Sequence, residues 1–345
     1  MNNKWFLRIG ITACFLAFFV IVLGAYVRLS DAGLGCPDWP GCYGQITAPD
    51  DAQEISNALN IFPEHTIEPA KAWKEMVHRY FASLLGLLIL AMAFLAWRHR
   101  HTANQQLKLP LILVGLVIFQ GMLGMWTVTQ LVRPTIVTLH LLTGLLTLSL
   151  LFWVTLKHIK PWTKKIKSAD ISSAVKPLAK IALLVLVLQI FLGGWTSTNY
   201  VALYCPDFPT CQGSWLPNTN FSEAFVFFKD PTVNYEGGSL SLDAGVTVHY
   251  LHRIGALITT ILLGTLALLM LFKCSSPVLK TLSKVLLFML SLQVSLGIAN
   301  VVLVLPIPIA VSHNAIAAVL LLTLILINYT LSKNTQMTQL SRGSS

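Results

Sequence analysis

Four histidines lie inside long apolar stretches of the chain, where ionisable side chains are rare: His78, His140, His252 and His313. An ionisable group at membrane depth is energetically expensive and tends to be functional, although a single histidine can also form a hydrogen bond between two helices. Each of these histidines recurs at the matching place in the other half of the chain, which favours function. Two opposed imidazoles between apolar helices are the ligands that a bis-histidine haem needs. We therefore expect two haem sites, one in each half.

The two predicted sites differ in one neighbouring residue. Glu75 lies three residues before His78, and His249 lies three residues before His252. Residues three apart share a helix face, so the first site has a carboxylate beside it and the second has an imidazole. This difference predicts different functions for two otherwise equivalent sites. Glu75 is the one acid that the apolar stretches supply at this level, which excludes a di-metal carboxylate centre.

An arginine follows the histidine at both of these places. Arg79 and Arg253 come directly after His78 and His252, near the expected outer surface. A guanidinium group binds a carboxylate through two parallel hydrogen bonds, so both arginines are candidate contacts for haem propionates. The alternative is that they only extend their charged ends to the membrane surface.

Two short cysteine loops complete the set of residues that could do chemistry. The segment "GCPDWPGCYG" at 35–44 is matched by "YCPDFPTCQG" at 204–213. Disulfides persist in oxidising compartments, and the prolines favour a turn that brings the ends of each loop together. We expect two local disulfides, Cys36–Cys42 and Cys205–Cys211, either as structural links or as redox-active pairs. Two thiolates without a nearby histidine make a poor zinc site, and Cys14 and Cys274 are expected to be free thiols.

These residues must be positioned by helices that cross a membrane. The chain is 55% hydrophobic and only 11% charged, whereas soluble domains carry about 25% charged residues. A bilayer core is crossed by about 20 apolar residues, and each crossing segment must be a helix because backbone polar groups find no water there. We expect eight such helices, at roughly 8–28, 75–97, 109–129, 134–156, 178–198, 246–272, 279–304 and 308–331.

The distribution of charge predicts the orientation in the membrane. Most lysines and arginines lie in the two termini and in the segments 98–108, 157–180 and 273–284, whereas every acid except Asp170 lies on the opposite side. Positively charged segments stay in the cytoplasm. Both termini are therefore expected inside, and both cysteine loops on the outer face. This topology explains the net charge of +10, so we expect a lipid bilayer as the environment and no nucleic-acid partner.

The whole chain is an internal duplication. "LGAYVRLSDAGLGCPDWPGCYG" is matched by "LGGWTSTNYVALYCPDFPTCQG" at an offset of 169 residues. "EMVHRYFASLLGLLIL" is matched by "HYLHRIGALITTILL", and "IVTLHLLTGLLTL" by "IAVSHNAIAAVLL", at offsets of 174 and 173. Landmarks that agree in order and spacing indicate a repeated structural unit. The predicted fold is an all-α membrane protein of two tandem four-helix bundles, related by a pseudo-two-fold axis along the membrane normal.

This duplication predicts the domain boundaries. We expect an N-terminal half at 1–156, a basic cytoplasmic linker at 157–177, a C-terminal half at 178–332 and a cytoplasmic tail at 333–345. A smaller repeat lies within the helices, where Gln120, Gln189 and Gln293 each precede a glycine by four residues. Glycine allows close helix approach, and we interpret this pattern as helix packing.

The ordered set of motifs resembles the haem A synthase family, which makes haem A from haem O for terminal oxidases. The resemblance runs from "GAYVRLSDAGLGCPDWPGCYG" through "EMVHRY", "TLHLLTG" and "HYLHRIGA" to "SHNAIAA". It implies eight helices in two halves, a haem b cofactor held by His252 and His313, and a substrate haem received by His78 and His140. It also implies a catalytic role for Glu75, and a link between Cys36–Cys42 and redox chemistry or haem handling.

The resemblance further implies oxidation of a ring methyl of haem O to a formyl group. Iron with two histidine ligands has no open position for oxygen, so either a histidine leaves or water supplies the oxygen atom. Glu75 would then accept a proton or orient the water, His249 would lie in the surroundings of haem b, and a haem O synthase or another donor would supply haem O. One alternative is a di-haem b electron-transfer protein, which the histidine pattern alone fits equally well. A duplicated transporter is a second, but it predicts polar residues at the membrane midplane.

Overall fold

The described residues of this computed structural model, 4–101, 107–159 and 173–342, fold into α-helices and connecting loops without a β-strand. Eight of the helices are long and apolar enough to cross a membrane, as the sequence predicts. They are α1 (Lys4–Leu29), α3 (Pro69–Arg98), α4 (Lys108–Thr129), α5 (Pro134–His158), α6 (Val175–Thr198), α8 (Leu242–Lys273), α9 (Pro277–Val302) and α10 (Ile307–Arg342). Two short helices, α2 (Ala52–Ile61) and α7 (Phe221–Ala224), lie in the long connections after α1 and α6.

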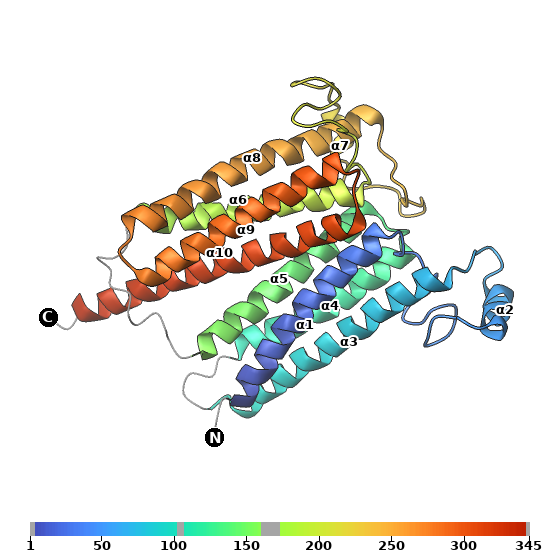
Figure 1. Cartoon of the computed structure of the whole chain (residues 1–345). Helices are drawn as coiled ribbons and strands as arrows, with labels where there is room; N and C mark the ends of the chain where they lie inside the picture. The colour runs from blue at the N-terminus through green and yellow to red at the C-terminus, as the bar shows by residue number, and fades with distance from the viewer. Residues whose placement is uncertain (1–3, 102–106, 160–172, 343–345) are drawn as a thin grey trace.

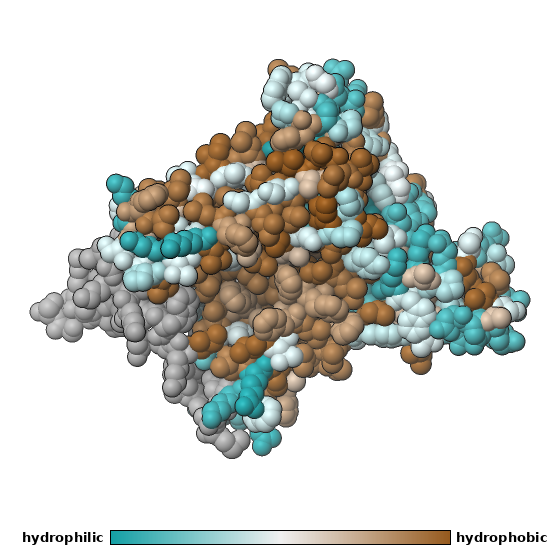
Figure 2. Space-filling model, viewed as in Figure 1, coloured by the Kyte–Doolittle hydropathy of each residue, from teal (hydrophilic) through white to brown (hydrophobic). Residues whose placement is uncertain are grey.

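Both long connections lie at the same end of the molecule, and both termini lie at the opposite end (Figure 1). Hydrophobic residues form a band over the middle of the bundle, while hydrophilic residues gather over the loops (Figure 2). Most of the predicted cytoplasmic linker lies at 160–172, outside the described residues. The division of the chain into the predicted domains stays a prediction.

The eight long helices form two four-helix rings. In the first ring α1 contacts α3 and α5, and α4 also contacts α3 and α5, so that α3 and α5 stand diagonally opposite each other. The second ring repeats this order with α6, α8, α9 and α10, and here α8 and α10 form the diagonal. The rings meet where α1 contacts α10, α5 contacts α6, and α5 contacts α10. Exchanging each helix for its repeat leaves this set of contacts unchanged, as a two-fold axis between the halves requires.

Residues that are equivalent in the repeat touch each other across this axis. The Arg28 guanidinium on α1 donates a hydrogen bond to the carbonyl of Ser197 on α6, 169 residues later. At the other end of the bundle the Tyr329 hydroxyl donates to the carbonyl of Leu156, 173 residues earlier. Both separations equal the sequence offsets of the repeat. A residue meets its own counterpart only close to a two-fold axis, so these two contacts locate that axis at both ends.

The backbone of the connecting turns is duplicated as well. Left-handed backbone, which is rare outside glycine, occurs at four pairs of non-glycine residues that follow the repeat offsets. The pairs are Asp31 and Tyr200, Tyr43 and Gln212, Leu131 and Val304, and Val132 and Leu305. Recurrence of this uncommon conformation at equivalent positions, despite different side chains, means that the two halves share their turn geometry as well as their helices.

The largest apolar core cluster lies on the side of the bundle away from the cysteine loops, and smaller clusters lie beneath the loops. Fully buried members of the core cluster include Met92 on α3, Leu148 on α5, Met270 on α8 and Leu324 on α10. Each lies farther from the cysteine loops along its helix than the histidine of the same helix. The tightly packed region therefore occupies the side towards the termini, and the histidines lie above it.

Candidate haem sites

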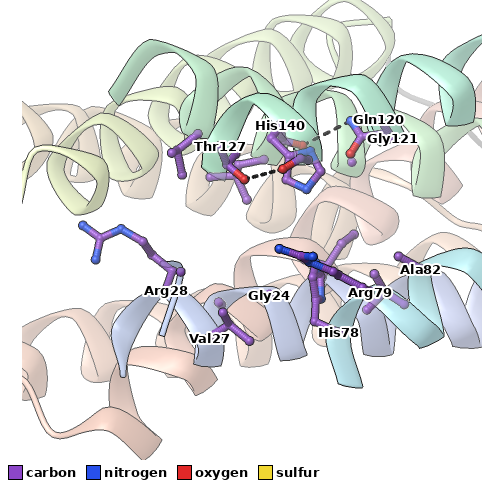
Figure 3. Close-up of a pocket in the computed structure, with 18 of the residues that line it drawn as sticks. Gly24, Val27, Arg28, His78, Arg79, Ala82, Gln120, Gly121, Thr127 and His140 are labelled. Atoms are coloured by element: carbon purple, nitrogen blue, oxygen red, sulfur yellow. Dashed lines mark hydrogen bonds between the residues drawn. The ribbon is translucent and has the colours of Figure 1, made fainter. Parts of the chain in front are cut away.

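A cavity of about 430 Å³ lies inside the first ring. His78 from α3 and His140 from α5 lie on opposite walls of it (Figure 3). Glu75 and Arg79 line the same cavity near the loops. The structure thus brings together all four residues that the sequence assigned to the first site.

The imidazoles of this cavity are positioned as a pair. The two helices that carry them stand diagonally across the four-helix ring. Their imidazole groups project inward and therefore face each other from opposite sides. The Nδ1 atoms of His78 and His140 are buried and have no hydrogen-bond partner. The Nδ1 atom of His313 in the second half is buried without a partner as well, so both halves share this feature. These observations fit a haem between the two histidines.

A glycine from the neighbouring helix faces the Cε1 atom of each of these rings. A Cβ atom added at Gly24 on α1 would lie 2.9 Å from Cε1 of His78, and one added at Gly124 on α4 would lie 3.7 Å from Cε1 of His140. In the second ring the corresponding distances are 3.0 Å from Gly193 to His252 and 3.1 Å from Gly297 to His313. The glycines interpreted as helix packing therefore also leave space for the four imidazoles. Their recurrence at the level of the histidines was the signal in the sequence.

The two four-helix rings differ in the contacts of the glutamine that precedes each glycine. In the second ring the Gln189 amide lies 2.9 Å from Nδ1 of His252, and the Gln293 amide lies 3.2 Å from Nε2 of His313. In the first ring the Gln120 amide instead donates to the His140 carbonyl, at 3.3 Å, and to the Thr143 hydroxyl. The equivalent position on α1 is a valine, Val20. Glutamine side chains therefore contact both imidazoles of the second site and neither imidazole of the first.

Glu75 joins its helix to the first cysteine loop. Its Oε2 accepts a hydrogen bond of 3.0 Å from the backbone N–H of Cys36, and its Oε1 pairs with Arg79 at 2.5 Å. Arg79 also donates to backbone carbonyls of the loop, those of Asp38, Pro40 and Gly41. The carboxylate is buried beneath the loop and still lines the cavity.

His249 and Arg253 repeat this arrangement in the second half. Nδ1 of His249 lies 3.2 Å from the backbone N of Cys205, and Nε2 of the same ring lies 3.3 Å from Nε of Arg253; a neutral imidazole can accept a hydrogen bond at only one of the two nitrogens. Arg253 also donates to the carbonyls of Cys205, Asp207 and Thr210. The two arginines thus hold the loops in place, a role that sequence reasoning missed. Contact with haem propionates stays a prediction for both.

The two cysteine loops contain the expected disulfides, Cys36–Cys42 and Cys205–Cys211. Asp38 accepts hydrogen bonds from the amides of Tyr43 and Gly44, and its equivalent Asp207 accepts from those of Gln212 and Gly213. All four cysteines are buried. Burial excludes bulky redox partners from the sulfur atoms and favours the structural role among the alternatives. Cys14 and Cys274 are free, as expected.

Residues of the second half also reach the first cavity. Gly194, Ser197 and Thr198 on α6 and Asn314 on α10 line it. The connection after α6 extends over the first half, where the amide of Tyr235 donates to the carbonyl of Leu131 and the Thr135 hydroxyl donates to the carbonyl of Phe227. The first site is therefore completed by the other half, which a motif search within one repeat could not find.

Comparison with known proteins places this arrangement in a family. A protein with 50% identity over 95% of this chain and 96% of its own length is named heme A synthase, from Shewanella oneidensis. A heme A synthase of Flavobacterium psychrophilum is 25% identical over 93% of this chain, and one of Shouchella clausii is 28% identical over 64% of it. The family model described as cytochrome oxidase assembly protein, COX15-CtaA, matches residues 7–325. This chain, with its duplicated rings and paired histidines, belongs to the COX15-CtaA family.

Proposed function

We propose that the protein is a haem A synthase, a membrane enzyme that oxidises a ring methyl of haem O to the formyl group of haem A. The observation that carries this assignment is the 50% identity to a heme A synthase over nearly the whole chain. The cavity between His78 and His140 supports it, because it offers two axial ligands and a carboxylate on one site. Haem O is the substrate and haem A the product.

The two sites have different occupants in this proposal. His78 and His140 receive the substrate haem, and the cavity that they line supports that role. His252 and His313 hold haem b, which supplies one-electron transfer when bound. The Gln189 contact to Nδ1 of His252 supports a resident cofactor there, since a group on the second ring nitrogen orients a metal-binding imidazole and strengthens binding.

Glu75 is the proposed catalytic residue. Oxidation of a methyl group to a formyl group releases electrons and protons, so a group beside the substrate must accept a proton. Glu75 lies on the same helix face as His78 and lines the cavity. Its carboxylate is held in place by the Cys36 amide and by Arg79, which orients it without occupying every acceptor site. His249 occupies the equivalent position in the second half, where it would lie beside haem b and influence the properties of that cofactor.

The proposed orientation places both cysteine loops on the outer face of the bacterial inner membrane and both termini in the cytoplasm. The loops lie at one end of the bundle and the termini at the other (Figure 1). The lysines and arginines of the inner segments support this orientation. Haem O, which is itself membrane-soluble, would come from a haem O synthase or another donor in the same bilayer.

The test is haem analysis of membranes that contain the protein with and without a co-expressed haem O synthase. Extracted haems are separated by chromatography and identified by mass. We expect haem A only when both proteins are present, and haem b with the purified protein in either case. Replacement of His252 or His313 by alanine should remove haem b, and replacement of His78 or His140 should chiefly remove haem O and haem A. Two molecules of haem b and no haem A would instead support the di-haem electron-transfer protein.

A further inference from the structure

The wall of the first cavity between α3 and α4 is built from small or exposed residues. Ala82, Ser83 and Gly86 line the cavity from α3, and Val117, Ile118 and Gly121 line it from α4. Ser83 is exposed on the surface of the bundle, and Ile118 is 60% exposed. The same residues thus belong to the cavity and to the surface, so the cavity reaches the outside of the bundle through the α3–α4 seam.

The seam is open because two of its residues are glycines that have open space where a side chain would stand. A Cβ atom added at Gly121 would meet nothing within 4 Å, and one added at Gly86 would meet only Val117, at 3.9 Å. Buried helix contacts are normally packed to the density of a crystal. Here two adjoining membrane-spanning helices leave that space unfilled.

The second half carries larger residues at the same places. Thr260 stands where the first half has Gly86, and Val294 stands where it has Gly121. Leu257 replaces Ser83 and Leu290 replaces Val117, while the pair Ile118 and Ser291 changes in the opposite direction. Four of these five equivalent positions therefore gain side-chain volume in the half that we assign to haem b.

We propose that the α3–α4 seam binds the isoprenoid chain of the substrate and is the opening through which that chain passes to the lipid. This inference rests on the proposed function, which supplies the substrate. Haem O and haem A carry a long isoprenoid chain that haem b lacks. With the macrocycle between His78 and His140, an apolar chain that leaves through this seam stays out of water and needs no closed pocket. The second half has no such chain to accommodate, and its seam carries the larger side chains.

The test copies the second half into the first. The double variant Gly86→Thr, Gly121→Val fills the seam with residues that the equivalent backbone already carries. The matched control is Gly115→Val, because Gly115 is on the same helix, also meets nothing within 4 Å and does not line the cavity. Each purified protein retains its own haem b and is titrated with haem O or with additional haem b. The new low-spin haem absorption reports binding at the first site.

We expect the double variant to bind haem O at least about tenfold more weakly than the wild type, because the added side chains displace part of the isoprenoid chain. A single methylene group in an apolar pocket already changes binding about tenfold or more. Binding of haem b at the first site should be unchanged, and Gly115→Val should behave like the wild type. Equal weakening of haem O and haem b, or no weakening of either, would overturn the assignment of the seam. If the wild type itself fails to bind haem O at His78 and His140, the proposed function fails before the seam is tested.

Discussion

The two halves of the molecule share a scaffold that pairs two histidines, and they differ in the residues around those histidines. Both rings place histidines on diagonal helices, and both set a glycine opposite each imidazole. They differ where Glu75 corresponds to His249, and where glutamines contact both imidazoles of only the second half. Duplication thus preserved the histidines, while in the proposed function a few neighbouring residues separate a site that releases its haem from one that keeps it.

The largest effect on haem A formation is expected from substitution of Glu75, compared with the same substitution of its counterpart His249. Glu75→Gln keeps a hydrogen-bond acceptor for the Cys36 amide but cannot take up a proton at neutral pH. We expect it to retain both haems and to lower haem A formation by about 10²-fold or more, the usual contribution of general acid–base catalysis. His249→Gln should leave turnover largely intact and change the potential or occupancy of haem b. Haem analysis of membranes with a co-expressed haem O synthase measures haem A yield and haem b content for both variants. An equal loss of haem A in the two variants would mean that Glu75 only holds the cysteine loop in place.

A second prediction concerns a feature that both halves share, the glycine opposite each imidazole. Gly24→Ala places a methyl group 2.9 Å from a ring carbon, which is closer than such contacts allow, and Gly193→Ala places one at 3.0 Å, which is tighter than almost all such contacts. Overpacking of this kind costs about 1–3 kcal/mol, and it should appear as lost haem in the half that carries the change. Gly124→Ala, at 3.7 Å, should be milder. The haem-to-protein ratio and the low-spin absorption bands measure the effect, with Gly264→Ala on α8 as the control, because its Cβ meets nothing within 4 Å.

A third prediction sharpens the difference in the glutamines. Gln189→Leu removes an amide that contacts the His252 ring, so haem b should bind about tenfold more weakly. Gln120→Leu removes an amide that contacts only the His140 carbonyl and Thr143, and the affinity of the first site for haem O should change less. Titration of each apo site with its haem gives the two affinities. A larger loss from Gln120→Leu would contradict the distinction between the two sites.

The smallest effect on turnover is expected from the disulfides. The double variant Cys36→Ser, Cys42→Ser should unfold at a lower temperature, because a local cross-link contributes up to about 3 kcal/mol, but it should still form haem A. The equivalent change of Cys205 and Cys211 should behave alike. Thermal unfolding and haem A yield are measured on the same preparations. Loss of haem A formation in a folded, haem-loaded protein with only the first pair changed would instead establish a redox role.

The sequence predicted the eight spans and the residues of the sites because both depend on strong local signals. Apolar length identifies the helices, and intramembrane histidines stand out against it. Helix ends were less accurate: α3 was expected from 75 and begins at Pro69, and α8 was expected from 246 and begins at Leu242. Their first turns are more polar, and a hydropathy pattern does not register a helix that extends beyond the lipid.

The contacts that surround the histidines could not be predicted in the same way. That Gly24 faces His78 depends on how α1 and α3 rotate against each other, which no spacing within one helix determines. Arg79 also donates to backbone carbonyls of a loop 38 to 41 residues away in the sequence, a contact that its place after His78 does not indicate. The seam between α3 and α4 likewise became visible only when both helices could be compared with their counterparts in the second half.

The contact between Arg28 and Ser197 bears on how such a protein could arise. Close to a two-fold axis, two identical chains would have to place an arginine against an arginine, and the like charges would repel each other. Here one copy keeps the arginine, which also stacks on the Tyr200 ring at 3.6 Å, while the other offers a carbonyl group. Because the second copy carries serine in place of a second arginine, only one guanidinium lies there, and this asymmetry is open only to copies that can mutate independently. Joining the two units in one chain therefore released the residues on the axis from self-complementarity, and it is the same freedom that allowed one half to specialise as the partner of the other.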